Sequence, residues 1–224
     1  MVEVAGDPCV NMSHEEIKAH LCEIADRHIA ARASYRNIRK DAATELDVVM
    51  TEEEGMNLSV ITMKGIGLAI EDCRAFNNAE VFCQNVKLLD PILTCRKLDD
   101  NLGGNSYAIY QHVKTPMIVS NRCNFLGVHQ IELENGGYIH LSTSKGMQQI
   151  EQANTTLIGK DVLGHCLMTY AKFEPCEDGI KVTACYAIDP AGSLPDFIKN
   201  KIATENTKAP EKMIAHLRKQ KGLK

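Results

Sequence analysis

The spacing of apolar residues predicts a helix near the start of the chain and a pair of strands after it. Ser13 and Glu16 form a capping-box pattern, which predicts a helix over 14–33. Its apolar stripe is formed by Ile17, Leu21, Ile24 and His28. Residues 44–51 and 57–66 have the composition of strands on either side of the glycine-containing turn EEEGM.

A second helix is predicted next, and both of its ends are marked in the sequence. Asn77 and Glu80 have the spacing of a helix start. Asp90-Pro91 ends the helix, because the residue before a proline resists helical geometry. The apolar stripe of this helix is formed by Phe82, Val86 and Leu89.

After the second helix the pattern becomes that of an antiparallel sheet. The predicted strands are 106–113, 122–133, 138–144, 164–173 and 180–188. Asn135-Gly136 and Glu177-Asp178-Gly179 separate two pairs of these strands and are typical of hairpin turns. Residues 145–163 are polar and less regular, so we expect an irregular connection there.

A long helix is predicted over 194–219. Gly192 allows a tight turn before it, Ser193 is the expected N-cap, and Pro195 suits the first helical turn. Pro210 lies well inside the helical pattern and is expected to kink it. The apolar stripe of this helix is formed by Leu194, Ile198, Ile202, Ala209, Met213 and Leu217, with Phe197 beside it.

This order of elements predicts an α+β fold built on a meandering sheet, and a single domain over residues 1–224. A curved antiparallel sheet with a long terminal helix across its concave side leaves an internal space. The chain contains no repeat or linker that would divide it.

Composition narrows the class of protein. The 224 residues are 44% hydrophobic and 24% charged, with a net charge of −4, which argues against a nucleic-acid groove. No stretch reaches the ~20 apolar residues of a membrane span. The nine cysteines include no Cys-x-x-Cys and follow no secretory signal pattern, so we expect a soluble cytoplasmic protein with reduced thiols.

Motifs for catalysis or metal binding are weak. His165 and Cys166 are neighbours on a predicted strand, so their side chains point to opposite faces and cannot form a dyad. His14, His20 and His28 lack partners at metal-ligand spacing and are expected on the surface. We therefore expect no metal and no cofactor.

The last third of the chain contains a series of landmarks: Asp189, Gly192, Pro195, Asn200, Pro210 and Leu217-Arg218-Lys219. Their order resembles the closing segment of START domains, the StAR-related lipid-transfer family. Upstream, YQHVKTPMIVSNRC resembles the strand, the proline loop and the arginine (Arg122) of the family, and the element order matches over residues 13–219. The chain departs from the family in having Cys123 after that arginine and no tryptophan, and in the sequence of residues 142–145.

The resemblance implies a helix-grip fold and a non-catalytic function. One lipid would occupy a tunnel between the sheet and the last helix, gated by that helix and by the loop at Pro116, and would be carried between membranes. The resemblance further implies transient contact with a membrane surface and a monomer. Phe197 and Ile198 are the expected lid residues, because they follow the glycine turn.

The resemblance and the strand alternation together indicate which side chains would meet the lipid. Gln111 falls where the ceramide-transfer branch of the family has a glutamine that contacts the polar head, and His140 lies opposite an asparagine of that branch. Tyr107 shares the face of Gln111, whereas Tyr110 and His112 lie on the other face. The expected ligand-binding residues are Tyr107, Gln111, Arg122, Asn124, His140, Ser142, Met168, Tyr186, Phe197 and Ile198.

Three alternatives stay open. A sterol held by a buried ion pair is disfavoured, because residues 107–113 include no acid, so a phospholipid or sphingolipid is favoured. An enzyme of the cyclase or hydrolase type could use His140 or His112 as general base, although no acid–base pair with matching spacing is present. An interaction module would have its cavity filled by its own side chains.

Overall fold

The computed structural model describes residues 9, 12–89, 92–99, 102–115 and 119–223. Short 3-10 turns occupy Arg32–Ser34, Val86–Leu89 and Thr155–Leu157. The helices are α1 (His14–Ala31), α2 (Ile70–Phe76), α3 (Phe82–Asn85), α4 (Gln148–Ala153), α5 (Asp196–Asn206) and α6 (Ala209–Gln220). The strands are β1 (Arg36–Asp41), β2 (Leu46–Glu53), β3 (Met56–Ile66), β4 (Ile92–Asp99), β5 (Ser106–Val113), β6 (Arg122–Glu132), β7 (Tyr138–Thr143), β8 (Val162–Leu163), β9 (His165–Cys176) and β10 (Gly179–Asp189).

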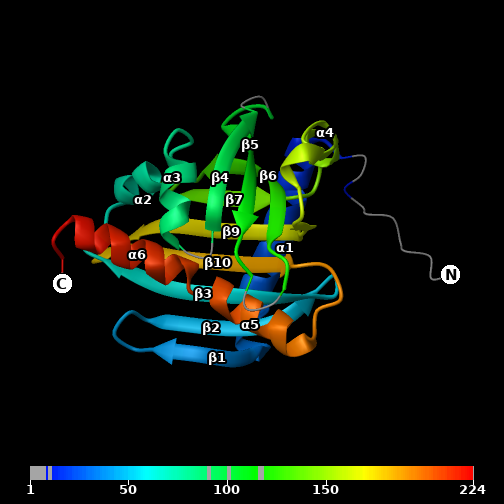
Figure 1. The fold of residues 1–224 in the computed structure, drawn as a ribbon. Helices are drawn as coiled ribbons and strands as arrows, with labels where there is room; N and C mark the ends of the chain where they lie inside the picture. The colour runs from blue at the N-terminus through cyan, green and yellow to red at the C-terminus, as the bar shows by residue number, and fades with distance from the viewer. Residues whose placement is uncertain (1–8, 10–11, 90–91, 100–101, 116–118, 224) are drawn as a thin grey trace.

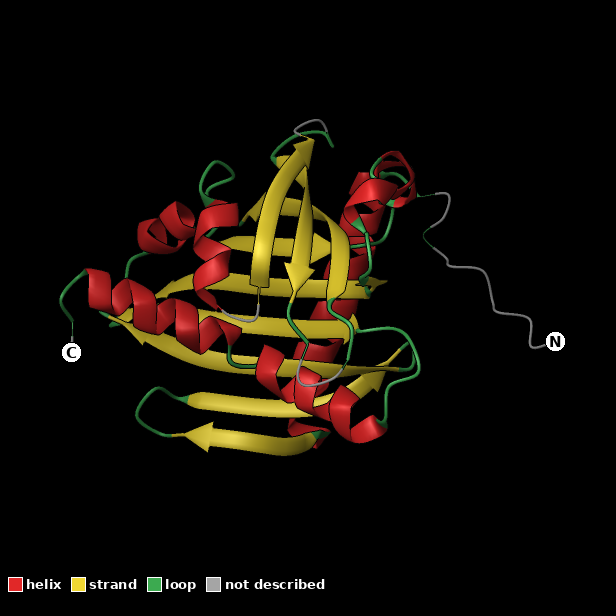
Figure 2. Ribbon diagram, in the orientation of Figure 1, coloured by secondary structure: helices red, strands yellow, loops and turns green. Residues whose placement is uncertain are grey.

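The described strands form one curved sheet of ten strands. Its order is β1-β2-β3-β10-β9-β7-β6-β5-β4, and every pairing is antiparallel except that of the short β8 with β6. Figure 1 shows β4 and β5 running across the direction of β9 and β10, so the sheet is strongly curved. α5 and α6 lie in front of the sheet, with α2 and α3 beside them, and α1 lies behind it (Figures 1 and 2). The expected α+β helix-grip architecture is confirmed.

α1 starts where the capping box predicted and covers the convex face of the sheet. The Glu16 amide donates to Ser13 Oγ at 3.3 Å, and the Ser13 amide donates to Glu16 Oε2 at 2.8 Å. Ile17, Leu21 and Ile24 are buried in a cluster with strand residues of that face. His28 is buried, not on the surface as expected, because its two ring nitrogens hydrogen-bond the Tyr35 hydroxyl and the Glu53 carboxylate, each at 2.8 Å.

The five strands predicted from residue 106 onward are all present, with bounds that move by three residues at most. Five helices and strands were not predicted: β1, α2, β4, and also α4 and β8, which lie in the segment expected to be irregular. The helix expected to start at Asn77 begins instead at Phe82, and Asn77 is the C-cap residue of α2. Asp90 and Pro91, the expected helix stop, lie outside the described residues.

The C-terminal segment is two helices and not one kinked helix. α5 ends at Asn206, and Pro210 stands in the first turn of α6, where its missing amide costs no hydrogen bond. Ser193 does not cap α5, because Pro195 occupies the N-cap position and no side chain caps it. The turn before α5 is set by Asp189 Oδ1, which accepts from the Ala191 amide at 2.9 Å, while Gly192 adopts a φ of +75°.

The two helices are held to the rest of the molecule very differently. On α6, Glu211 forms a two-point ion pair with Arg39 of β1, and Ile214 packs against Gly65 of β3, where a side chain would collide with it. Four residues of α6 are buried, whereas Ile198 is the single buried residue of α5. α5 and α6 together cover the concave face of the sheet, and we call this pair of helices the roof. α6 is therefore the firmly attached part of the roof, and α5 is the loosely attached part. In the described part of the chain no helix combines the length and the apolarity needed to cross a bilayer.

Candidate functional site

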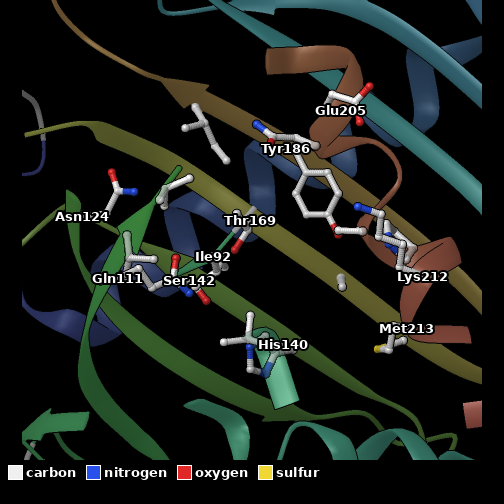
Figure 3. Close-up of a pocket in the computed structure, with 18 of the residues that line it drawn as sticks. Ile92, Gln111, Asn124, His140, Ser142, Thr169, Tyr186, Glu205, Lys212 and Met213 are labelled. Carbon is white, nitrogen blue, oxygen red and sulfur yellow. The ribbon is translucent and has the colours of Figure 1, made fainter. Parts of the chain in front are cut away.

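A cavity of about 560 Å³ lies between the concave face of the sheet and the roof formed by α5 and α6 (Figure 3). Its volume falls in the range of small-molecule sites. Side chains of β5, β6, β7, β9 and β10 form its wall, and α3 with the turn after it closes one side. Much of this wall is apolar, contributed by Phe82, Val86, Ile92, Leu126, Phe173, Val182, Ile188 and Met213.

A group of uncharged polar side chains interrupts this apolar wall. Because side chains alternate along a strand, His140 and Ser142 of β7 face the cavity together. Gln111 of β5, Thr169 of β9 and Tyr186 of β10 join them from other strands of the sheet. Figure 3 shows Gln111, Ser142 and His140 along the wall formed by the sheet, with the ring of Tyr186 reaching into the same space. Such a site suits a molecule that is mostly apolar and has one polar end.

His140 is a deeply buried titratable group of this wall. Among the described titratable groups that line the cavity, only Arg122, at 5% exposed, is less accessible than His140, which is 7% exposed. The His140 ring lies against Phe82 with the ring centroids 4.8 Å apart. Burial lowers the pKa of its imidazole to about 4, so the ring is neutral at pH 7. Neither ring nitrogen has a hydrogen-bond partner among the described residues.

Arg122 lines the cavity, but its guanidinium group hydrogen-bonds main-chain carbonyls. Its Nε donates to the Pro190 carbonyl at 2.8 Å and its Nη2 to the Ala191 carbonyl at 3.0 Å, and its Nη1 donates to the Ser120 carbonyl. Burial lowers the pKa of the guanidinium from its ordinary value, which the carboxylate of Asp189 opposes, and the group stays charged at pH 7. Arg122 thereby holds the turn that leads into α5.

The mouth of the cavity lies beside α5. Of the residues lining the cavity, those that are exposed are Lys114, Lys201 and Glu205. Lys201 and Glu205 belong to α5, and Lys114 follows β5 directly. The expected gate at Pro116 lies outside the described residues.

Comparison with solved structures identifies the fold. Human STARD10 superposes with a TM-score of 0.69 at 17% identity, over 93% of this chain and 80% of that chain. The protein has a START-like fold. Human StAR-related lipid transfer protein 5 gives a TM-score of 0.68 at 12% identity (92% of this chain, 98% of that chain). A StAR-related lipid transfer protein from Xanthomonas axonopodis gives 0.62 at 16% identity (82% and 98%).

The likeness of this START-like domain to other proteins lies in structure and not in sequence. No protein-family model matches the chain, and no curated protein matches it. The solved structures nevertheless support the START-like fold that the order of the landmarks predicted.

The START-like cavity brings together most of the predicted ligand-binding residues. Those that line it are Gln111, Arg122, Asn124, His140, Ser142 and Tyr186. Tyr107 lies on the same face of the sheet but packs among apolar residues next to Phe82. Asn124, in the amide orientation its neighbours favour, donates to the carbonyls of Cys123 and Gly164, both at 3.2 Å.

Met168, Phe197 and Ile198 do not line the cavity. Met168 packs beneath α1 on the convex face, because a bulge in β9 opposite Ala187 and Ile188 puts Leu167 and Met168 on the same side of the sheet. Phe197 points away from the core and is 67% exposed, while Ile198 is buried under α5.

Thr169 is the polar lining residue of the sheet that sequence reasoning missed. It alternates with Ala171 and Phe173, which also line the cavity, so its face could have been read from the far end of the strand. Counting the alternation from the start of the strand gives the wrong face for Thr169, because the bulge lies before it. Among the described residues no group of three or more His, Cys, Asp and Glu side chains could hold a metal ion.

Proposed function

We propose that this START-like domain takes up one lipid in its cavity and carries it between membranes without catalysing a reaction. The observation that supports the proposal is the cavity itself, which combines an apolar wall with a few uncharged polar groups. Burying an acyl chain there would stabilise the complex by about 0.8 kcal/mol for each CH₂. The whole chain acts as one binding unit.

Entry and exit are proposed to occur by movement of α5. Its few buried contacts and its place at the mouth both favour this helix over α6 as the gate. The exposed Phe197, with Lys201 on the same helix, suits a brief contact with a membrane surface. The segment at Pro116 is proposed to complete the gate.

An enzyme on the same scaffold is less well supported. His112 lies outside the cavity, with Nε2 3.1 Å from Asp161 Oδ2. His140 lies inside the cavity, but burial holds its pKa at about 4 and no carboxylate orients it. A general base at neutral pH needs a pKa nearer to 7.

Native mass spectrometry and a vesicle-to-vesicle transfer assay would test the proposal. Ala171 lines the cavity, so Ala171→Phe should fill part of it and abolish both lipid binding and transfer. The matched control is Ala153→Phe, because Ala153 is exposed at the end of α4 and its replacement should change neither property. A wild-type protein that binds and transfers no lipid would contradict the proposal.

A further inference from the structure

The polar side chains that the sheet contributes to the cavity are uncharged, with the exception of Arg122. They are an imidazole, two amides and three hydroxyl groups, carried by His140, Gln111, Asn124, Ser142, Thr169 and Tyr186. An ionised group placed against them would lose its hydration and gain no opposite charge. The wall is therefore suited to a neutral polar group.

The single buried cation of the described cavity wall directs three of its five N–H donors to the main chain. All three nitrogens of the Arg122 guanidinium donate to main-chain carbonyls, those of Ser120, Pro190 and Ala191. The other basic side chains that line the cavity come from α5, from α6 and from the residue after β5, and not from strands of the sheet. A phosphate could meet positive charge there, but not at the wall formed by β5 and β7.

His140 needs a particular kind of partner. A neutral imidazole has one N–H that donates and one nitrogen that accepts. Both nitrogens are buried and unpartnered among the described residues, and leaving such groups unpaired is costly. A phosphate diester can only accept, so it would leave the bare nitrogen unsatisfied. A hydroxyl group both donates and accepts, so it can pair with either nitrogen, and when it donates to the bare nitrogen it can still accept from a neighbouring amide or hydroxyl.

We infer that the cavity selects an uncharged lipid whose polar end is a hydroxyl group, and that His140 holds this hydroxyl. The inference rests on the proposed function and deepens it. Ser142, two residues from His140 on β7 and on the same face, is placed to complete the hydrogen bonding of the hydroxyl oxygen. The hydrocarbon part then lies along the apolar wall under α6. The sequence favoured a phospholipid or a sphingolipid, and this inference excludes the lipids whose buried head group is a phosphate.

The test uses phosphatidylcholine vesicles that each carry a trace of one radiolabelled lipid. The labelled lipids are a sterol, a ceramide, a diacylglycerol and phosphatidylcholine itself, and the first three distinguish the sources of the hydroxyl. Protein-bound label is counted after the vesicles are removed. At least one hydroxyl lipid should bind roughly tenfold more tightly than phosphatidylcholine, and its methyl ether should lose most of that advantage.

Variants then assign the effect to His140. His140→Phe keeps a ring against Phe82 but removes both nitrogens, so it should weaken binding of the hydroxyl lipid about tenfold and leave its methyl ether unchanged. His140→Gln keeps a donor and an acceptor and should restore part of the affinity. Thermal unfolding of each variant confirms that it is folded.

The outcomes separate the two proposals. If phosphatidylcholine binds as well as the hydroxyl lipids, or if the methyl ether binds as well as its parent in the wild-type protein, lipid binding stands and the inference is overturned. An unchanged affinity of folded His140→Phe for the hydroxyl lipid also overturns it. If none of the labelled lipids binds, the proposed function itself fails.

Discussion

Cys83 on α3 and Cys95 on β4 form a thiol pair beside the cavity wall. The hydrogen bond between them lowers the pKa of Cys83 from its ordinary value, with help from Lys87 and Lys97, and raises the pKa of Cys95. Cys83 is also half-buried, whereas Cys95 is buried. The more exposed thiol of the pair is therefore the one with more thiolate at neutral pH.

Cys83 is expected to be the first of the cysteines to react with iodoacetamide at pH 7. Burial raises the pKa of Cys22 to about 11, and the pKa of Cys176 is raised by burial and by Asp178, so these two half-buried thiols should react more slowly. Peptide mass spectrometry over time measures the order. Cys95→Ala should slow the reaction of Cys83 with iodoacetamide, because it removes the thiol that donates a hydrogen bond to Cys83. Faster labelling of Cys22 or Cys176 than of Cys83 in the wild-type protein would contradict this assignment.

Arg122 provides a second test at the same scale. Arg122→Met leaves three main-chain carbonyls without their charged donor and should lower the free energy of unfolding by roughly 2–4 kcal/mol, as measured in urea. Arg122→Lys keeps the charge but not the three-way geometry, and it should recover only part of the loss. A loss below about 1 kcal/mol in the methionine variant would show that these carbonyls find other donors.

At the residue scale, the sequence predicted on which face of the sheet a side chain lies wherever a strand is regular. Plain alternation placed Gln111, His140 and Ser142 on the cavity side, and the structure agrees. It failed for Met168, because one extra residue in a strand reverses every later side chain and no local signal marks a bulge. His28 was misplaced because its partners, Tyr35 and Glu53, are brought to it by the fold.

The elements that were missed are short or highly charged. β1 has the sequence RNIRKD and stands at the edge of the sheet, so it shows no apolar alternation. α2 spans seven residues, too few for helical periodicity to stand out. The roof was predicted as one helix because Pro210 suits both a kink and a first turn, and only the unwound residues between α5 and α6 decide between them.

The two helices of the roof should differ in hydrogen exchange. Backbone amides of α5 should exchange roughly tenfold faster than those of α6, because α5 has one buried residue and α6 has four. Exchange followed by mass spectrometry measures both helices in one experiment. Glu211→Gln, which weakens the pairing with Arg39, should speed exchange in α6 and leave α5 unchanged. Equal protection of the two helices would argue against α5 as the gate.

For the whole molecule, two buried histidines couple stability to pH. Burial lowers the pKa of His129 and of His140 from 6.5 to about 4. Between these two pKa values the unfolded chain binds protons that the folded chain does not. The free energy of unfolding therefore has its full value above about pH 6.5 and falls as the pH drops toward 4. Each histidine should contribute roughly 3 kcal/mol to this loss.

Urea unfolding at pH 7 and at pH 4.5 measures this dependence. His140→Phe should reduce the difference between the two pH values, and it should not destabilise the lipid-free protein at pH 7, because it removes two unpartnered buried nitrogens. His165→Gln is the control, since His165 is exposed. An equal pH dependence in the wild-type protein and in His140→Phe would mean that His140 is already protonated or hydrated in the folded state.

The break between α5 and α6 has a consequence for heating. Because the two helices share no continuous hydrogen-bond ladder, the loss of one does not propagate into the other. The weaker helix can melt while the sheet and α6 remain intact. If the proposed lipid is bound, warming should thus release it in a separate step below the temperature at which the sheet unfolds. Cooling should restore binding without any refolding of the sheet.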